Sequence, residues 1–124
     1  MNEATSMHVI AVPDLEQSAA YYRQTLGFQI HEIGDPGWCI FTLGQCRIMA
    51  GHCPDATPPG ETGDHSYFAY ITLPQIDSYF DSVRKKGARI LKELQDEPWG
   101  MREFAIQTGD GHRIMFGQEL NPLR

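Results

Sequence analysis

The spacing of apolar and polar positions predicts two helices of the same kind, one in each half of the chain. Each has an apolar stripe with the i, i+4, i+7 and i+11 spacing of a core-facing helix surface. The first stripe consists of Leu15, Ala19, Tyr22 and Leu26. The second repeats these spacings with Ile76, Phe80, Val83 and Gly87. The chain therefore contains an internal repeat, and we expect the two halves to share one architecture.

Short runs of apolar, β-branched and aromatic residues around each helix predict strands. The first half is expected to contain His8–Val12, the helix Leu15–Leu26, Gln29–Ile33, Trp38–Leu43 and Arg47–Gly51. The second half is expected to contain Tyr67–Leu73, the helix Ile76–Lys86, Arg89–Glu93, Arg102–Gln107 and Arg113–Gly117. The last strands of the two halves, RIMAG and RIMFG, are identical at four of five positions. Each half is thus a strand, a helix and three further strands.

The helix ends carry further signals. Asp14 with Gln17 three residues later is close to a capping box, whereas Gln75 is a poor N-cap before the second helix. Gly27 and Gly87 follow the helices and suit a left-handed C-terminal cap.

The two halves span residues 7–51 and 65–118, and residues 52–64, rich in proline and glycine, form a linker. At 124 residues we expect a single domain over 1–124. A module of about 55 residues is too small to bury its sheet alone, so the copies are expected to pack together or with a second chain, as a homodimer. The sequence leaves open whether the halves pair within one chain or swap between two.

Composition narrows the classes of function. Ten Lys and Arg against sixteen Asp and Glu give a formal charge of −6, which argues against nucleic acid as a partner. No apolar run approaches the roughly 20 residues that span a bilayer, and the N-terminal residues lack the pattern of a signal peptide, so we expect a cytoplasmic protein that does not bind membranes. The cysteines Cys39, Cys46 and Cys53 are expected to be free thiols, because their spacing lacks the tight pairing of zinc sites.

The tandem β-α-β-β-β module resembles the vicinal oxygen chelate superfamily of glyoxalases, ring-cleaving dioxygenases, epimerases and drug-sequestering resistance proteins. Local similarities are VPDL at 12–15, LGF at 26–28, KGA at 86–88 and DGHRI at 110–114. The resemblance implies an α+β fold in which tandem βαβββ modules form a curved mixed sheet around a cavity. Residues 98–104, PWGMREF, are especially similar to the bleomycin-resistance branch, in which this segment lines the drug pocket. Thr108-Gly109 departs from the Asp-Pro that the family often has in the last turn.

In the metal-dependent members, ligands project from the first and last strand of each module. The corresponding positions here hold Met7, Met49, Phe68 and Met115. Thioethers and aromatic rings do not suit hard divalent ions, so we expect no metal of the family type and no other cofactor. If the assigned ligand positions were shifted by one residue, His8 and His65 would become candidate ligands. Such a shift moves side chains to the opposite face of a strand, so His8 and Met7 cannot both face the cavity.

Alternation along the strands places an apolar set on the face toward the expected cavity, with aromatic residues at its walls. The predicted ligand-binding residues are Met7, Val9, Trp38, Phe41, Arg47, Met49, Phe68, Tyr70, Trp99, Arg102, Phe104 and Met115. Methionine and aromatic side chains are typical of small-molecule pockets, although they are equally typical of a filled core. Arg47, like Arg113, holds an anion, pairs with acidic residues or extends to solvent at a strand end. Arg102 binds either a ligand or a surface carboxylate.

Three functions follow from this set. The first is a metal-independent small-molecule-binding protein of the bleomycin-resistance type that sequesters an aromatic or amphipathic ligand. The second is a divalent-metal-dependent lyase, isomerase or dioxygenase. The third is a regulatory or structural protein with a packed pocket. A metal-free enzyme would need a general acid or base, for which His112 and Glu103 are the candidates.

Overall fold

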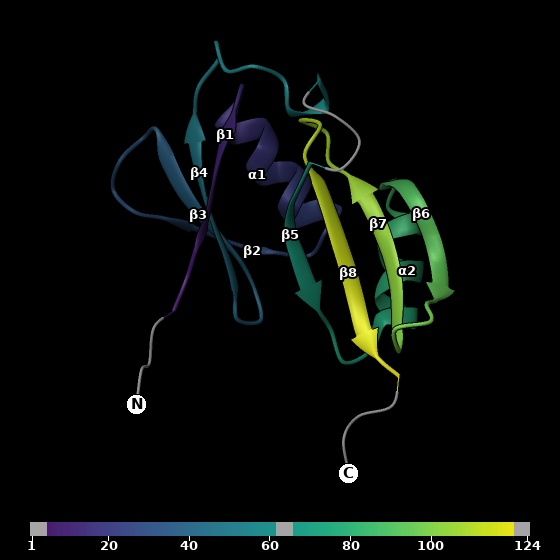
Figure 1. Ribbon diagram of the computed structural model, residues 1–124. Helices are drawn as coiled ribbons and strands as arrows, with labels where there is room; N and C mark the ends of the chain where they lie inside the picture. Colours follow the sequence, from purple (N-terminus) through teal and green to yellow (C-terminus); the bar gives the residue numbers. More distant parts are fainter. Residues whose placement is uncertain (1–4, 62–65, 121–124) are drawn as a thin grey trace. The chain divides into compact units, whose positions relative to one another are not determined.

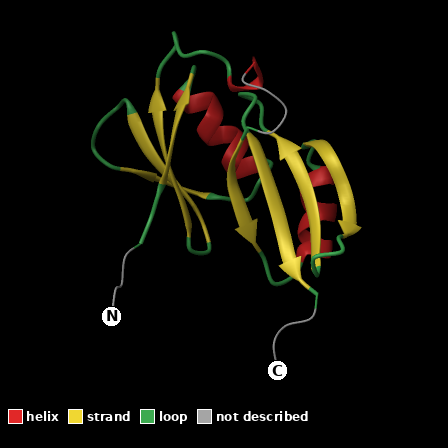
Figure 2. Cartoon of the chain, viewed as in Figure 1, coloured by secondary structure: helices red, strands yellow, loops and turns green. Residues whose placement is uncertain are grey.

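The computed structural model describes residues 5–61 and 66–120. The chain divides into two compact units, Met1–Thr57 and Pro58–Arg124, and this division falls inside the predicted linker. Each unit holds one helix and one four-stranded sheet (Figures 1 and 2). No helix within 5–61 or 66–120 is long and apolar enough to span a bilayer.

The first unit contains one copy of the predicted module. Its elements are β1 (His8–Val12), α1 (Leu15–Gln24), β2 (Gln29–Glu32), β3 (Trp38–Leu43) and β4 (Cys46–His52). The strands are ordered β1-β4-β3-β2. β1 runs parallel to β4, and the other pairs are antiparallel.

The second unit repeats this topology. Its elements are a short 3₁₀ turn (Pro59–Glu61), β5 (Tyr67–Thr72), α2 (Ile76–Lys85), β6 (Arg89–Asp96), β7 (Met101–Gln107) and β8 (Arg113–Glu119). The strands are ordered β5-β8-β7-β6, with β5 parallel to β8. The predicted α+β fold and its ten elements are confirmed. The largest difference is at β6, which continues three residues past its predicted end because register shifts between Ile90 and Gln95 let it keep pairing with β7.

In each module the N-terminus of the helix lies next to the C-terminal end of the fourth strand. His52 Nδ1 accepts a hydrogen bond from the Leu15 amide at 3.1 Å, and Gln118 Oε1 accepts one from the Ile76 amide at 2.9 Å. Both residues directly follow the glycine of the repeated strand sequence. Asp14 caps α1 as predicted, by accepting from the Gln17 amide at 3.1 Å. Gln75 makes no such bond, so Gln118 supplies the side-chain acceptor for α2.

The core of each unit lies between its helix and one face of its sheet. In the first unit the Tyr22 and Phe41 rings are fully buried with centroids 4.6 Å apart. In the second, the Phe104 ring lies 4.9 Å from that of Phe80 and 5.0 Å from that of Phe116. Because strand side chains alternate between faces, the neighbours of these residues project to the side without a helix, the open face of each sheet.

Candidate functional site

The open face of the second sheet carries a buried carboxylate beneath two exposed aromatic rings. Glu103 on β7 is adjacent to Phe104, which faces α2, so alternation directs Glu103 to the open face. Around it stand Tyr70 from β5, Lys92 from β6 and Trp99 from the turn between β6 and β7. The Glu103 side chain is 5% exposed, whereas Trp99 and Tyr70 are 64% and 46% exposed.

Both carboxylate oxygens of Glu103 accept hydrogen bonds. The Tyr70 hydroxyl donates to Oε2 at 2.7 Å, and the Trp99 indole nitrogen donates to the same oxygen at 3.0 Å. Lys92 Nζ donates to Oε1 at 2.8 Å. A charged acceptor makes hydrogen bonds that are shorter and stronger than neutral ones, so Glu103 fixes the orientation of both rings.

Lys92 links this carboxylate to a second one. Its ammonium lies 2.6 Å from Glu97 and 5.8 Å from the centre of the Trp99 ring. Glu97 also accepts from Gln95 Nε2 at 2.7 Å. Two carboxylates and one ammonium leave the cluster with a net charge of −1, in agreement with the acidic character of the chain.

The pKa shifts agree with this pairing. Burial acts to raise the pKa of Glu103, but the hydrogen bonds from Lys92, Trp99 and Tyr70 outweigh it and hold the pKa below its ordinary value. Burial and the hydrogen bond to Glu103 raise the pKa of the Tyr70 phenol. Glu103 is therefore ionised and Tyr70 protonated at neutral pH. A carboxylate that is ionised and accepts from three donors is better suited to positioning the rings than to exchanging protons.

A glycine lets Tyr70 reach Glu103. Tyr70 lies beside Met115 in the register of β5 and β8, and its ring crosses β8 over Gly117, which pairs with Glu103 on β7. A Cβ atom on Gly117 would overlap the Tyr70 hydroxyl. The repeat has the same device in the first unit, where a Cβ on Gly51 would lie 2.7 Å from the Trp38 ring. The glycine of each repeated strand sequence thus accommodates an aromatic ring on an open face.

Several predicted residues of the first unit also lie on its open face. Val9 on β1 lies directly beside Met49 on β4. Trp38 on β3 pairs with Gly51, the next residue of β4 after Met49 on the same face. Val9 is 65% exposed and Trp38 is 38% exposed. Met7 directly precedes β1 and is half-buried.

Arg47 donates to Thr5 Oγ1 at 3.2 Å and to the Ser6 carbonyl at 3.0 Å, so it holds the segment before β1.

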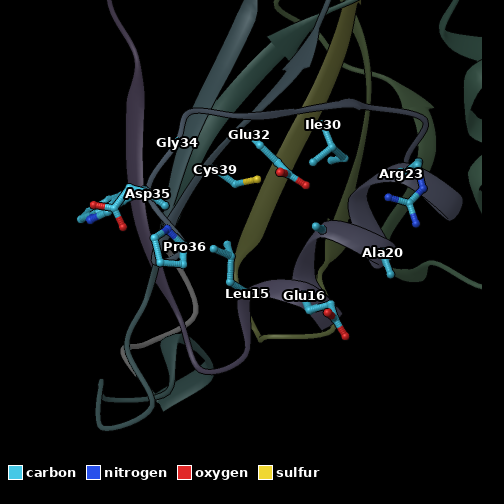
Figure 3. Close-up of a pocket in the computed structure, with 12 residues that line it drawn as sticks. Leu15, Glu16, Ala20, Arg23, Ile30, Glu32, Gly34, Asp35, Pro36 and Cys39 are labelled. Carbon is cyan, nitrogen blue, oxygen red and sulfur yellow. The ribbon is translucent and has the colours of Figure 1, made fainter.

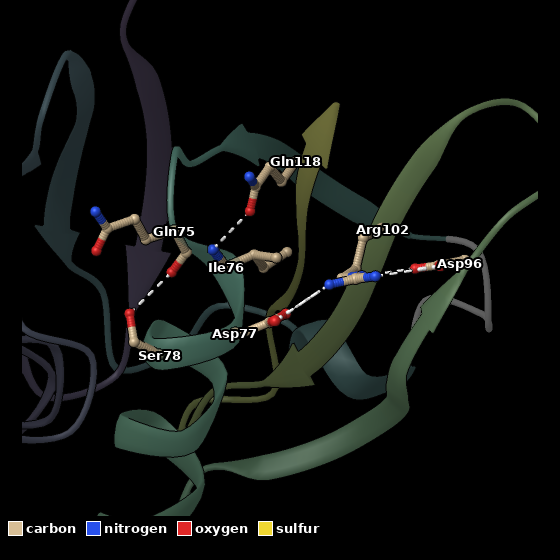
Figure 4. A network of polar contacts seen from close by, with 7 residues as sticks. All are labelled: Gln75, Ile76, Asp77, Ser78, Asp96, Arg102 and Gln118. Atoms are coloured by element: carbon tan, nitrogen blue, oxygen red, sulfur yellow. Dashed lines mark hydrogen bonds and ion pairs between the residues drawn. The ribbon is translucent and has the colours of Figure 1, made fainter. Parts of the chain in front are cut away.

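Three predicted ligand-binding residues lie on the helix sides of the sheets instead. Phe41 and Phe104 are fully buried in the two cores. Arg102 reaches Asp96 at 2.6 Å and Asp77 of α2 at 3.1 Å (Figure 4). Phe41 and Phe104 were predicted at the cavity walls because aromatic rings are common in pockets. For Arg102 the structure shows the second predicted alternative, a surface carboxylate. Arg102 and Phe104 alternate with Glu103 along β7 and so lie on the opposite face from the candidate site, and Phe41 belongs to the core of the first unit.

The remaining candidates lie in the second unit. Met115 is half-buried beside Tyr70. Phe68 lies at a register shift between Tyr67 and Ala69, and its ring centroid is 5.6 Å from that of His112. His112 is 8% exposed, so its side chain is buried although it lies in the last turn.

Lys92 is not among the predicted site residues. It lies between the two register shifts of β6, and strict alternation does not assign a residue there to a face. The repeated glycine could have suggested the site, because an internal strand glycine often marks a close approach.

The described residues do not offer a metal centre. Within 5–61 and 66–120 no three His, Cys, Asp or Glu side chains gather closely enough to hold an ion. His8 begins β1 and is half-buried, and His65 lies outside the described residues. Cys39, Cys46 and Cys53 are free thiols, as predicted.

The sequence model of a protein family, described as the Glyoxalase/Bleomycin resistance protein/Dioxygenase superfamily, matches residues 5–116. The chain belongs to this superfamily. The match covers both βαβββ modules, so the predicted resemblance is confirmed. A comparison with curated proteins gave no match.

Several solved structures share the fold. TioX from Micromonospora sp. ML1 is 21% identical, with a TM-score of 0.73 over 98% of this chain and 100% of that one. A glyoxalase/bleomycin resistance protein/dioxygenase from Alicyclobacillus acidocaldarius is 12% identical, with a TM-score of 0.77 over 96% and 93%. A protein of unknown function from Agrobacterium tumefaciens is 20% identical, with a TM-score of 0.72 over 97% of each chain. At these identities the likeness concerns the fold alone.

Proposed function

We propose that this member of the superfamily is a metal-independent small-molecule-binding protein that sequesters an aromatic or amphipathic ligand on the open face of the second sheet. The observation that carries the proposal is the pair of exposed rings, Tyr70 and Trp99, held by the buried carboxylate of Glu103. Exposed aromatic rings in fixed orientations are typical of binding surfaces.

Preorganisation is the physical advantage of this arrangement. Immobilising a side chain on binding costs about 0.5–1.5 kcal/mol, and rings already fixed by Glu103 avoid most of that cost. Met115 beside Tyr70 supplies a flexible apolar contact that adapts to the shape of a ligand. The first sheet offers a surface of similar composition in Val9, Trp38 and Met49.

Metal independence is supported by the side chains at the family's ligand positions. Met7, Met49, Phe68 and Met115 provide only thioethers and an aromatic ring, which do not fit a hard divalent ion. Glu103 is the carboxylate at the centre of the candidate site, and it is already committed to three donors.

The first experiment uses N-phenylnaphthylamine, a neutral aromatic fluorophore. We expect its fluorescence to rise on binding, with the same affinity before and after dialysis of the protein against a chelator. Trp99→Leu is expected to weaken binding on the order of tenfold or more, because a central aromatic contact commonly contributes about 2 kcal/mol. The matched control is Ile33→Ala, which removes a 46% exposed apolar side chain that belongs to the first unit and not to the second sheet.

Two outcomes would contradict the proposal. Loss of binding on chelation, with recovery on adding one divalent metal, would favour a metal-dependent enzyme. Equal affinity of the Trp99→Leu and control variants would place the probe elsewhere on the molecule.

We also infer that the chain forms a homodimer, because each unit of roughly 60 residues buries little apolar area and leaves one sheet face without a helix. Sedimentation equilibrium is expected to give twice the chain mass of 14.0 kDa. A mass of one chain at all concentrations would overturn this inference.

A further inference from the structure

The helix side of the second unit is filled by a cluster of aromatic rings. These are Tyr79, Phe80, Phe104 and Phe116. The Phe104 ring stacks on that of Phe116, and the Phe80 and Tyr79 rings cover them from α2. The cluster leaves little space between this helix and its sheet.

Small residues occupy the corresponding positions of the first unit. The offset of 61 that aligns the two helices matches Ser18 and Ala19 with Tyr79 and Phe80. On the sheet, Cys39 pairs with Ala50 directly before Gly51, as Phe104 pairs with Phe116 directly before Gly117. The four small residues are therefore Ser18, Ala19, Cys39 and Ala50.

Larger side chains elsewhere in the first unit compensate for only part of this volume. The rings of Tyr22, Phe28 and Phe41 fill the core beside the C-terminal half of α1. A groove of about 780 Å³ remains along α1, beside β2 and the start of β3 (Figure 3). Its apolar walls include Leu15, Ala19, Ala20, Ile30 and Pro36. This volume lies within the range of about 300–1,000 Å³ found for small-molecule sites.

Charged side chains of mostly one sign surround the groove. Glu16 lies on α1, Glu32 at the end of β2 and Asp35 in the following turn, against the single cation Arg23 among the lining residues. Figure 3 shows the Glu32 carboxylate and the Cys39 sulfur near one another over the groove. Burial and the neighbouring Glu32 raise the pKa of the Cys39 thiol, so it stays uncharged at neutral pH. An apolar floor beneath a net charge of −2 is complementary to an amphipathic cation.

We propose that this groove in the first unit is a second small-molecule site, which takes a compact organic cation with an aromatic or aliphatic body. The body would lie against Ala19, Ala20 and Cys39, with the positive group toward Glu32 and Glu16. This site is on the helix side of the first sheet and is independent of the function proposed for the open face of the second.

To test the proposal, the full chain is titrated with naphthylmethylammonium and, separately, with its neutral analogue naphthylmethanol. The NMR chemical shifts of the backbone amides report binding in each titration. Shifts are expected to centre on α1 and residues 30–39, with the cation bound more tightly than the alcohol. Glu32→Gln should weaken the cation about two- to fivefold, as for an exposed ion pair, and leave the alcohol unchanged.

The strongest variants fill the groove with a larger side chain. Cys39→Phe introduces the residue that the repeat has as Phe104, and it is expected to abolish binding of both probes. Ala20→Leu, at a half-exposed position of the wall, is a second filling variant that does not disturb the buried core. The control Ala11→Leu adds the same bulk at an exposed position of β1 outside the groove and should bind normally.

The outcomes are distinct. Unchanged cation binding in Ala20→Leu, or equal affinity for cation and alcohol, would overturn the proposal. A groove-filling variant that lowers the mass measured by sedimentation would also overturn the proposal, because the groove would then be occupied by a surface of a second protein chain. Trp99→Leu should not change cation binding, which separates failure of this site from failure of the open-face site.

Discussion

Phe104→Ala is expected to lower the free energy of unfolding by about 3–5 kcal/mol, the range for truncating a buried phenylalanine. Phe104 is fully buried and its ring lies within 5.0 Å of the Phe80 and Phe116 rings. The remaining rings, two on α2 and one on β8, are fixed by their own elements and cannot all move into the vacated space. Urea denaturation of the wild type and the variant measures the difference.

This variant distinguishes core packing from ligand contact. If Phe104 lined the ligand cavity, as the sequence suggested, its loss would weaken N-phenylnaphthylamine binding and cost little stability. Trp99→Ala is the matched comparison, because Trp99 is a 64% exposed aromatic five residues earlier in the chain. We expect Trp99→Ala to lower the free energy of unfolding by less than half as much as Phe104→Ala does. We expect it to weaken N-phenylnaphthylamine binding more than Phe104→Ala does. The reverse order would contradict the assignment of faces in β7.

The repeat made the fold predictable. Strand and helix periodicity, glycine caps and the duplicated RIM sequence located all ten elements, because these signals are local and each depends on residues close together in the chain. Gly27 and Gly87 do have the positive φ angles that their cap positions predicted. Family resemblance then supplied the arrangement of these elements, and the match over residues 5–116 confirms it.

The site was less predictable because it depends on which face each side chain takes. Phe104 and Glu103 are adjacent in the sequence, and no local signal shows which of them contacts the helix. Lys92 lies in a bulged part of β6, where alternation fails. Tyr70 and Trp99 were predicted as ligand contacts and Glu103 as a possible acid or base, but no local signal indicated that this carboxylate holds the two rings in place.

The groove in the first unit is explained by comparing residues at matched positions of the two halves, and not by comparing their helices and strands. Residues that diverge at matched positions, such as Cys39 and Phe104, occupy equivalent places in two similar cores. A core can change from filled to hollow through such substitutions while its backbone is kept. The similarities between the halves predict the fold, whereas this space results from their differences.

The free energy of unfolding of Glu103→Gln is expected to be lower by about 2 kcal/mol at neutral pH. The amide keeps the shape of the side chain but removes the negative charge that Lys92, Tyr70 and Trp99 contact. Breaking a fully buried ion pair costs about 3–5 kcal/mol, but Lys92 keeps Glu97 as a partner and its side chain is 24% exposed, so a smaller loss is expected.

The pH dependence of this difference tests its electrostatic origin. Because the folded protein holds the pKa of Glu103 below its unfolded value of about 4.3, the stabilisation is complete above that pH and is lost as pH falls through the folded pKa. The two proteins should therefore differ by a constant amount near neutral pH and converge in acid. Glu97 titrates in both and largely cancels in the comparison.

Urea denaturation over a series of pH values gives this difference directly, and the near-ultraviolet circular dichroism of the two proteins reports whether Tyr70 and Trp99 keep their fixed orientations. A difference that stays the same from neutral to acid pH would mean that the side chain acts through its packing. Convergence in acid together with loss of the aromatic signal in the variant is the expected result, because one ionised carboxylate both stabilises the second unit and orients the rings on its open face.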